Sequence, residues 1–157
     1  MQLTKQLHIL CIEKTILLST AESCTGGALA YAITSEPGAS RIFNEGFIVY
    51  SNTAKIKNLS VLPETLQNHG AVSEQVAIEM AVNCSKITNS TASISITGIA
   101  GPGGSENKPE GRVCFGVKYN NKLVSKTVDF GAVGRKTVRN KSVDYALELL
   151  IKTFTDQ

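Results

Sequence analysis

The residue types that suggest chemistry begin with a serine on a glycine-rich turn. Ser23 lies in the stretch T-A-E-S-C-T-G-G (residues 20–27), which follows an apolar run and precedes a helix-like one. At such a turn, backbone N–H groups point outward from a helix N-terminus, where they can bind an anion or stabilise an oxyanion beside a nucleophile. An ordinary turn with a capping serine has the same local sequence, so this stretch alone leaves both interpretations open.

A second segment, Y-S-N-T-A-K (residues 50–55), supplies a tyrosine and a lysine. Tyr50 ends a strand-like run, and Lys55 falls near the first turn of the helix predicted after it. Strand ends that lead into helices gather at one edge of an open α/β sheet, so Ser23 and Lys55 could meet there. A lysine kept neutral by burial can take the proton of a serine, and Tyr50 could hydrogen-bond either one. A solvated lysine and a core tyrosine are the structural alternative.

The third segment is T-G-I-A-G-P-G-G-S (residues 97–105), whose glycines let backbone amides approach a ligand closely. It matches neither a P-loop nor a dinucleotide-binding G-x-G-x-x-G before a helix. Arg135 and Arg139, four residues apart at the start of the last predicted helix, share a face and suit a phosphate. A purely structural loop and a solvated arginine pair are the alternatives.

Two other residues near Ser23 are weaker candidates. Cys24 as a nucleophile would need a histidine base, and neither His8 nor His69 follows an obvious strand end. Glu22 faces the opposite side from Ser23 if the strand continues to it, and it has no evident carboxylate partner for glycosidic cleavage.

Composition narrows the class of protein. The chain has 157 residues, 42% of them hydrophobic and 18% charged, which is typical of one globular domain. A scattered net charge of +3 and the lack of tryptophan argue against nucleic-acid binding. Four cysteines without a C-x-x-C pair argue against a zinc ribbon or a disulfide scaffold and favour free thiols in a reducing cytosol. With no signal-peptide core and no bilayer-length apolar run, we expect a soluble, cytoplasmic protein.

The elements that must position these residues follow from apolar spacing and from turn residues. The spacing predicts helices near residues 3–13, 27–34, 53–58, 63–69, 74–86 and from about 134 to the end. Strands are predicted at residues 15–21, 46–50, 93–97, 113–119 and 122–130. Asn120-Asn121 suits a tight hairpin between the last two strands, which forces an antiparallel pair. We therefore predict an α/β fold, a three-layer α/β/α sandwich with a mixed, mostly parallel sheet.

Together, T-A-E-S-C-T-G-G, G-F-I-V-Y-S-N-T-A-K, H-G-A-V-S-E and T-G-I-A-G-P-G-G, in this order, resemble the CinA C-terminal-domain family, the nicotinamide-nucleotide amidases. The resemblance covers nearly the whole chain and is to the stand-alone form, so residues 1–157 are expected to form a single amidase domain. It implies hydrolysis of nicotinamide mononucleotide to nicotinate mononucleotide and ammonia, in pyridine-nucleotide recycling. It also implies a fold similar to anticodon-binding domains, a homodimer, and a reaction without metal or cofactor.

By position, the resemblance implies that Ser23 is the nucleophile, Lys55 the general base and Tyr50 the accompanying tyrosine. The positions that it implies for substrate binding are Thr25, Gly26, Thr97, Gly98, Ala100, Arg135 and Arg139. The chain departs from the family pattern in the glycine-rich loop, which is about one residue shorter, and at Glu110, where an apolar residue is usual. The Asp that often precedes Arg135 is also missing, because Gly134 stands there.

The leading hypothesis is an amidase that works through an acyl-enzyme on Ser23, with backbone amides near residues 24–26 or the Gly98 turn holding the oxyanion. Two alternatives stay open. The chain could be a non-catalytic nucleotide-binding module that keeps the pocket, a hypothesis prompted by the altered loop. It could also hydrolyse a different small amide.

Overall fold

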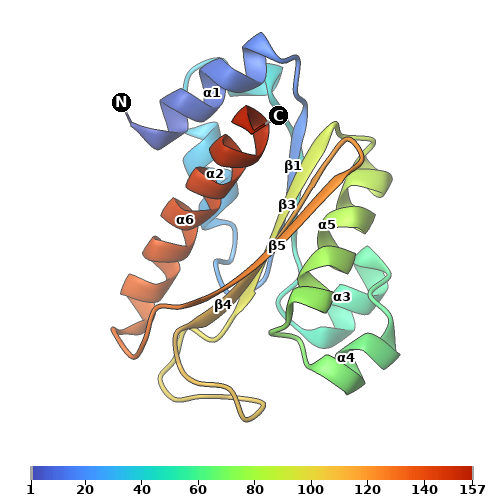
Figure 1. Cartoon of the computed structure of the whole chain (residues 1–157), viewed down its shortest axis with the longest axis vertical. Helices are drawn as coiled ribbons and strands as arrows, with labels where there is room; N and C mark the ends of the chain where they lie inside the picture. Colours follow the sequence, from blue (N-terminus) through green and yellow to red (C-terminus); the bar gives the residue numbers. More distant parts are fainter. Residues whose placement is uncertain (1, 157) are drawn as a thin grey trace.

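A mixed five-stranded sheet forms the centre of the molecule (Figure 1). The computed structural model describes residues 2–156. The strands are β1 (Leu18–Glu22), β2 (Phe43–Ile48), β3 (Ala92–Gly98), β4 (Arg112–Tyr119) and β5 (Lys122–Asp129), and they lie in the order β2-β1-β3-β4-β5. The β1–β2 and β1–β3 pairs are parallel, and the β3–β4 and β4–β5 pairs are antiparallel. Only β4 therefore runs against the other four strands.

Helices cover both faces of this sheet, as Figure 1 shows. The first group is α1 (Leu3–Glu13), α2 (Ala28–Thr34) and α6 (Arg135–Thr155), and the second is α3 (Asn52–Leu59), α4 (Pro63–His69) and α5 (Glu74–Thr88). A short 3-10 turn at Ala39–Arg41 precedes β2. This arrangement confirms the predicted three-layer α/β/α fold with a mixed sheet.

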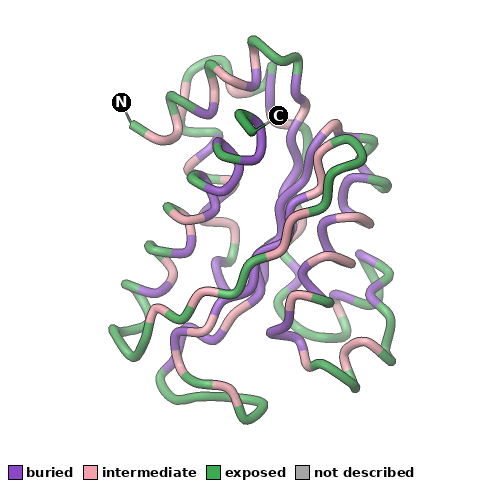
Figure 2. The backbone as a smooth tube through the Cα atoms, in the orientation of Figure 1, coloured by how far each residue is buried: buried purple, intermediate pink, exposed green. Residues whose placement is uncertain are grey.

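The central strands are buried on both faces, as their purple colour in Figure 2 shows. All five residues of β1 are buried, and β3 is buried from Ala92 to Thr97. Apolar side chains such as Ile94 and Ile96 join the core cluster that also contains α1, α2 and α6. On the other face, Ser93 and Ser95 donate hydrogen bonds to the backbone carbonyls of Ala81 and Ala77 in α5. Small polar residues there let α5 lie very close to the sheet.

Two strand boundaries differ from the predicted ones. The strand predicted at residues 15–21 begins only at Leu18, because Thr15 has a φ of +54° in the turn that ends α1. The strand predicted at residues 46–50 is Phe43–Ile48, because its pairing with β1 starts at Phe43. The N–H of Val49 still donates to the carbonyl of Glu22, so the chain stays beside β1 until just before Tyr50.

The three parallel strands bring the candidate segments to one edge of the sheet. Ser23 follows β1, Tyr50 follows β2, and the glycine-rich loop (residues 99–111) follows β3. The carboxyl ends of parallel strands meet at the same edge, where ligands bind in open α/β sheets. In Figure 1 this is the lower end of the sheet, where the glycine-rich loop extends and α6 begins.

Candidate active site

A buried carboxylate, that of Glu22, holds the turn that carries Ser23 against the start of α2. Glu22, which is 1% exposed, accepts hydrogen bonds from the hydroxyl of Thr25 and from the N–H groups of Leu29 and Ala30 at the start of α2. A carboxylate is favourable at this end of a helix, where N–H groups lack partners. Glu22 faces away from Ser23, as predicted. Its role in the structure is to hold the turn.

Lys55 lies directly beside Ser23. Its Nζ is 2.9 Å from Ser23 Oγ and donates hydrogen bonds of 3.0 Å to each of the carbonyls of Val49 and Tyr50. Ser23 Oγ itself donates to the carbonyl of Tyr50 at 3.2 Å. The lysine reaches this place because Ser51 caps α3 by accepting from the N–H of Ala54, which fixes the first turn of the helix.

The burial of Lys55 changes its acid–base chemistry. The residue is 1% exposed, and Lys55 belongs to no ion pair within residues 2–156. Burial lowers the pKa of Lys55 below its ordinary value of 10.5, while the nearby Cys24 and Glu106 raise it to a smaller extent. Desolvation disfavours the ammonium form, so the arrangement favours a neutral amine that can accept a proton.

The side chain of Tyr50 is directed elsewhere. Tyr50 is 59% exposed, and its hydroxyl accepts a hydrogen bond from Arg135 Nη2 at 2.9 Å. Arg135 Nη1 also donates to the carbonyl of Gly101 at 2.8 Å. Tyr50 therefore contacts the Ser23–Lys55 pair through its backbone carbonyl, and its hydroxyl links the end of β2 to α6 and the glycine-rich loop.

Arg139 lies behind the serine turn. It donates to the carbonyls of Cys24 and Thr25, at 3.1 and 3.3 Å. In a trans peptide the N–H points away from the C=O, so holding the Cys24 carbonyl also orients the N–H of Thr25. The N–H groups of Cys24 and Thr25 have no acceptor among the described residues. Both follow the candidate nucleophile, where an oxyanion hole is often formed.

These groups open into one cavity of about 290 Å³, which we call the Ser23 pocket. It is lined by Ser23, Cys24 and Lys55, and also by Tyr50, Arg135, Ala71, Val72 and the glycine-rich loop. The volume is close to the lower end of typical small-ligand pockets. The pocket combines a serine, a buried lysine and a rim that carries an arginine.

The predicted substrate-binding residues fall into two groups. Thr97, Gly98, Ala100 and Arg135 line the Ser23 pocket, whereas Thr25, Gly26 and Arg139 do not. Thr25 is bonded to Glu22, and Gly26 has a φ of +59° in the turn. The latter three shape the serine turn from outside the pocket.

Cys24 is buried beside Ser23, and burial raises its thiol pKa to about 12. A thiol at that pKa is protonated near neutral pH, and the thiolate is the reactive form. Sequence reasoning missed two other residues near the pocket, Glu106 and Lys108, at the tip of the glycine-rich loop. Their charge in a loop dominated by glycine and proline was the available signal.

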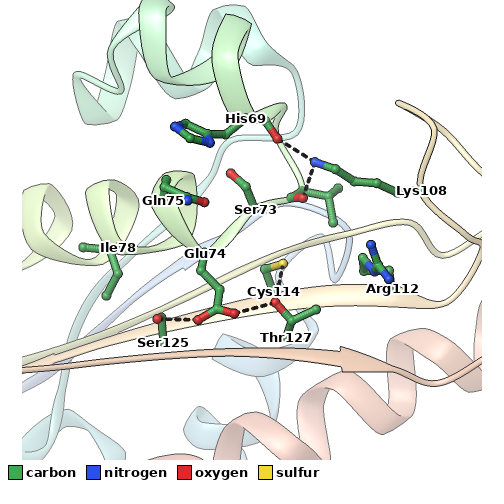
Figure 3. Close-up of a pocket in the computed structure, with 11 residues that line it drawn as sticks. His69, Ser73, Glu74, Gln75, Ile78, Lys108, Arg112, Cys114, Ser125 and Thr127 are labelled. Carbon is green, nitrogen blue, oxygen red and sulfur yellow. Dashed lines mark hydrogen bonds between the residues drawn. The ribbon is translucent and has the colours of Figure 1, made fainter.

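A larger cavity of about 710 Å³ lies along β5 and the start of α5 (Figure 3), and we call it the β5 groove. Its carboxylate, Glu74, accepts hydrogen bonds from Ser125 and Thr127, and these bonds lower the pKa of Glu74. Arg112 on the same side is paired with Asp129. The carboxylate of Glu74 and the guanidinium of Arg112 are thus bonded to neighbouring side chains, and the groove contains no counterpart of the Ser23–Lys55 pair among its lining residues.

Two further findings concern metals and membranes. Across residues 2–156, no group of three or more His, Cys, Asp or Glu side chains is placed to hold a metal ion. None of the described helices combines the length and the apolar character needed to cross a bilayer.

Comparison with known proteins connects this site to a family. The CinA C-terminal domain model matches residues 1–154. The CinA-like protein of Chloroherpeton thalassium is 51% identical over 128 residues, which cover 81% of this chain and 30% of that protein. The CinA-like protein of Kosmotoga olearia is 44% identical over 148 residues, covering 93% and 36%. The chain thus spans roughly a third of the length of these curated relatives.

Solved structures agree with this match. A crystal structure of a competence-damaged protein (CinA) superfamily protein from Escherichia coli superimposes with a TM-score of 0.94 at 36% identity, covering 96% of this chain and 88% of that one. The competence/damage inducible protein CihA of Agrobacterium tumefaciens gives 0.90 at 37% identity, covering 98% and 96%. Sequence, fold and match length lead to one conclusion: the chain belongs to the CinA C-terminal domain family.

Proposed function

We propose that this protein is a nicotinamide-nucleotide amidase, which hydrolyses nicotinamide mononucleotide to nicotinate mononucleotide and ammonia. The observation that carries the proposal is the 2.9 Å contact between Ser23 Oγ and the buried Nζ of Lys55. A serine beside a desolvated lysine is a known arrangement for nucleophilic attack on an amide carbonyl.

The hydrogen bonds of Lys55 fit a general base. A neutral amine has two N–H donors and one lone pair. The carbonyls of Val49 and Tyr50 accept the two N–H bonds. The lone pair can then take the hydroxyl proton of Ser23 when that hydroxyl turns from the carbonyl of Tyr50 toward Nζ. Ser23 Oγ then attacks the carboxamide carbon, and the N–H of Cys24, which lines the pocket, stabilises the oxyanion.

The rest of the reaction uses the same groups. Lys55 returns the proton to the departing nitrogen, which leaves as ammonia, and an ester forms on Ser23. Lys55 then activates a water molecule that hydrolyses the ester and restores the hydroxyl of Ser23. Arg135 at the pocket rim is the group we assign to the substrate phosphate, because Arg139 is bonded behind the turn. Arg135 would exchange its bonds to Gly101 and Tyr50 for the phosphate.

A substrate panel tests the proposal. Purified protein is incubated with nicotinamide mononucleotide, nicotinamide riboside and free nicotinamide, and ammonia and the acid product are quantified. We expect equal amounts of ammonia and nicotinate mononucleotide, with the riboside and the free base poorer because they lack the phosphate. If the protein hydrolysed another amide and not nicotinamide mononucleotide, the proposed substrate would be wrong. Tight binding of the nucleotide without any product would favour a non-catalytic binding module instead.

A further inference from the structure

The tip of the glycine-rich loop folds back onto the connection between α4 and α5. The carboxylate of Glu106 accepts hydrogen bonds from the N–H groups of Ala71 and Val72, at 3.1 and 3.4 Å. Lys108 Nζ donates to the carbonyls of His69 and Val72, at 2.6 and 2.5 Å, the two bonds drawn at Lys108 in Figure 3. We call this pair of side chains the clasp. Because both are charged, these hydrogen bonds belong to the stronger kind.

The clasp holds a segment that also belongs to the Ser23 pocket. Ala71, Val72 and Glu106 all line that pocket, so the clasp closes its wall where the glycine-rich loop meets the α4–α5 connection. From the sheet side, the hydroxyl of Thr97 donates to the carbonyl of Ala71 at 2.9 Å. The Ala71–Val72 backbone is therefore held between β3 and the loop tip.

The backbone at Glu106 indicates that its side chain has a purpose there. Ser105 and Lys108 exchange two backbone hydrogen bonds, of 3.1 and 2.8 Å, around a two-residue turn. Both central residues have positive φ, +54° at Glu106 and +60° at Asn107. Such turns favour Asn and Gly, so Asn107 is expected, but a glutamate in the left-handed region is strained. The two hydrogen bonds that the carboxylate of Glu106 accepts offset this strain.

We propose that Glu106 and Lys108 are positioning residues, which hold the outer wall of the Ser23 pocket in place so that substrate enters a preformed site. This proposal rests on the function proposed above. Without the clasp, the loop tip separates from Ala71 and Val72, and only a fraction of molecules has a complete pocket. Substrate binding then has to restore the closed wall, which weakens apparent affinity in proportion to that fraction. Saturating substrate restores the wall, so the maximal rate changes little.

Two variants and two controls test the clasp. Lys108→Met removes the ammonium, and Glu106→Gly removes the carboxylate while giving the turn the residue that its positive φ favours. If Glu106 served only to form the turn, Glu106→Gly would leave amide exchange and KM unchanged, and the free energy of unfolding would stay the same or increase. The controls are Lys57→Met and Glu64→Gln, which change exposed residues outside the clasp.

The first measurement is amide hydrogen exchange at Ala71 and Val72 in the substrate-free protein, since their N–H groups donate to Glu106. We expect exchange to accelerate by about tenfold or more in both variants and to stay unchanged in the controls. The second is steady-state hydrolysis of nicotinamide mononucleotide, in which KM should rise about tenfold and kcat should stay within about threefold.

Each result has a definite meaning. Unchanged exchange at Ala71 and Val72 in both variants would show that no clasp exists in solution and would overturn the proposal, whatever the activity. Faster exchange with an unchanged KM would overturn the positioning role. If the wild-type protein releases no ammonia, the proposed function fails, and the exchange measurement still decides separately whether the clasp exists.

Discussion

The Ser23 pocket and the β5 groove share Val72 in their lining, and they differ in how their polar groups are bonded. The β5 groove is the larger, about 710 against 290 Å³, and its carboxylate and guanidinium are bonded to neighbouring side chains. In the Ser23 pocket, a lysine is buried beside a serine hydroxyl and forms no ion pair with any residue that the structure describes. Size is therefore a poor guide to chemistry here. A titratable group that is buried away from water is a better indicator of a reactive site than cavity size.

The largest loss of activity is expected for Lys55→Met, which keeps the volume of the side chain and removes the base. We expect kcat/KM to fall by about 10²–10⁴-fold, the usual range for losing a general base. The measurement is ammonia release from nicotinamide mononucleotide, with Lys57→Met on the same helix as the matched control. Near-normal turnover by Lys55→Met would remove the distinction between the two regions.

The pH dependence of turnover reports the protonation state of the buried lysine. Lys55 must be neutral to accept a proton, so kcat/KM should increase with pH up to the pKa of Lys55 and then level off. Burial holds that pKa below its ordinary 10.5, so the plateau should begin at a lower pH than for an exposed lysine. A pH–rate profile checks this. If kcat/KM levelled off only at pH 10.5 or above, the result would contradict a desolvated lysine as the base.

Tyr50→Phe should have a smaller effect. The hydroxyl contacts Arg135, whereas Ser23 and Lys55 contact only the backbone carbonyl of Tyr50, which the variant retains. We expect the loss in kcat/KM to be less than about tenfold, close to the value of one hydrogen bond, and to appear mainly in KM. A fall in kcat as large as that of Lys55→Met would instead assign the hydroxyl to proton transfer.

The smallest effect on turnover is expected in the β5 groove. Glu74→Gln weakens the hydrogen bonds from Ser125 and Thr127, so the free energy of unfolding should drop by about 1 kcal/mol. Turnover should remain within about twofold, because Glu74 lies outside the Ser23 pocket. Urea denaturation and the ammonia assay measure the two quantities. Loss of activity without loss of stability would show that the groove takes part in the reaction.

The sequence predicted the fold well, because each element carries a local signal. Ser51 and Ser73 cap the helices expected after them, and Asn120 adopts the positive φ of the predicted hairpin turn. The meeting of Ser23 and Lys55 was predictable for a similar reason. Both follow parallel strands, and such strand ends share one edge of the sheet.

Other contacts of the site depend on distances that spacing does not encode. Arg135 and Arg139 share a helix face, yet Arg135 at the first turn contacts Tyr50 and Gly101, whereas Arg139 contacts the serine turn. Their separate contacts depend on where the start of α6 lies relative to the serine turn and the glycine-rich loop. The clasp could not be predicted without knowing where the long loop folds back, since Glu106 and Ala71 are 35 residues apart in sequence.

In the proposed mechanism Ser23, and not the neighbouring thiol, attacks the amide. Ammonia release from nicotinamide mononucleotide by the wild-type, Ser23→Ala and Cys24→Ala proteins tests it most directly, because each variant removes one candidate nucleophile and keeps the backbone N–H. We predict that Cys24→Ala retains turnover and that Ser23→Ala loses it, while circular dichroism shows both folded. Sustained ammonia release by folded Ser23→Ala would contradict the account.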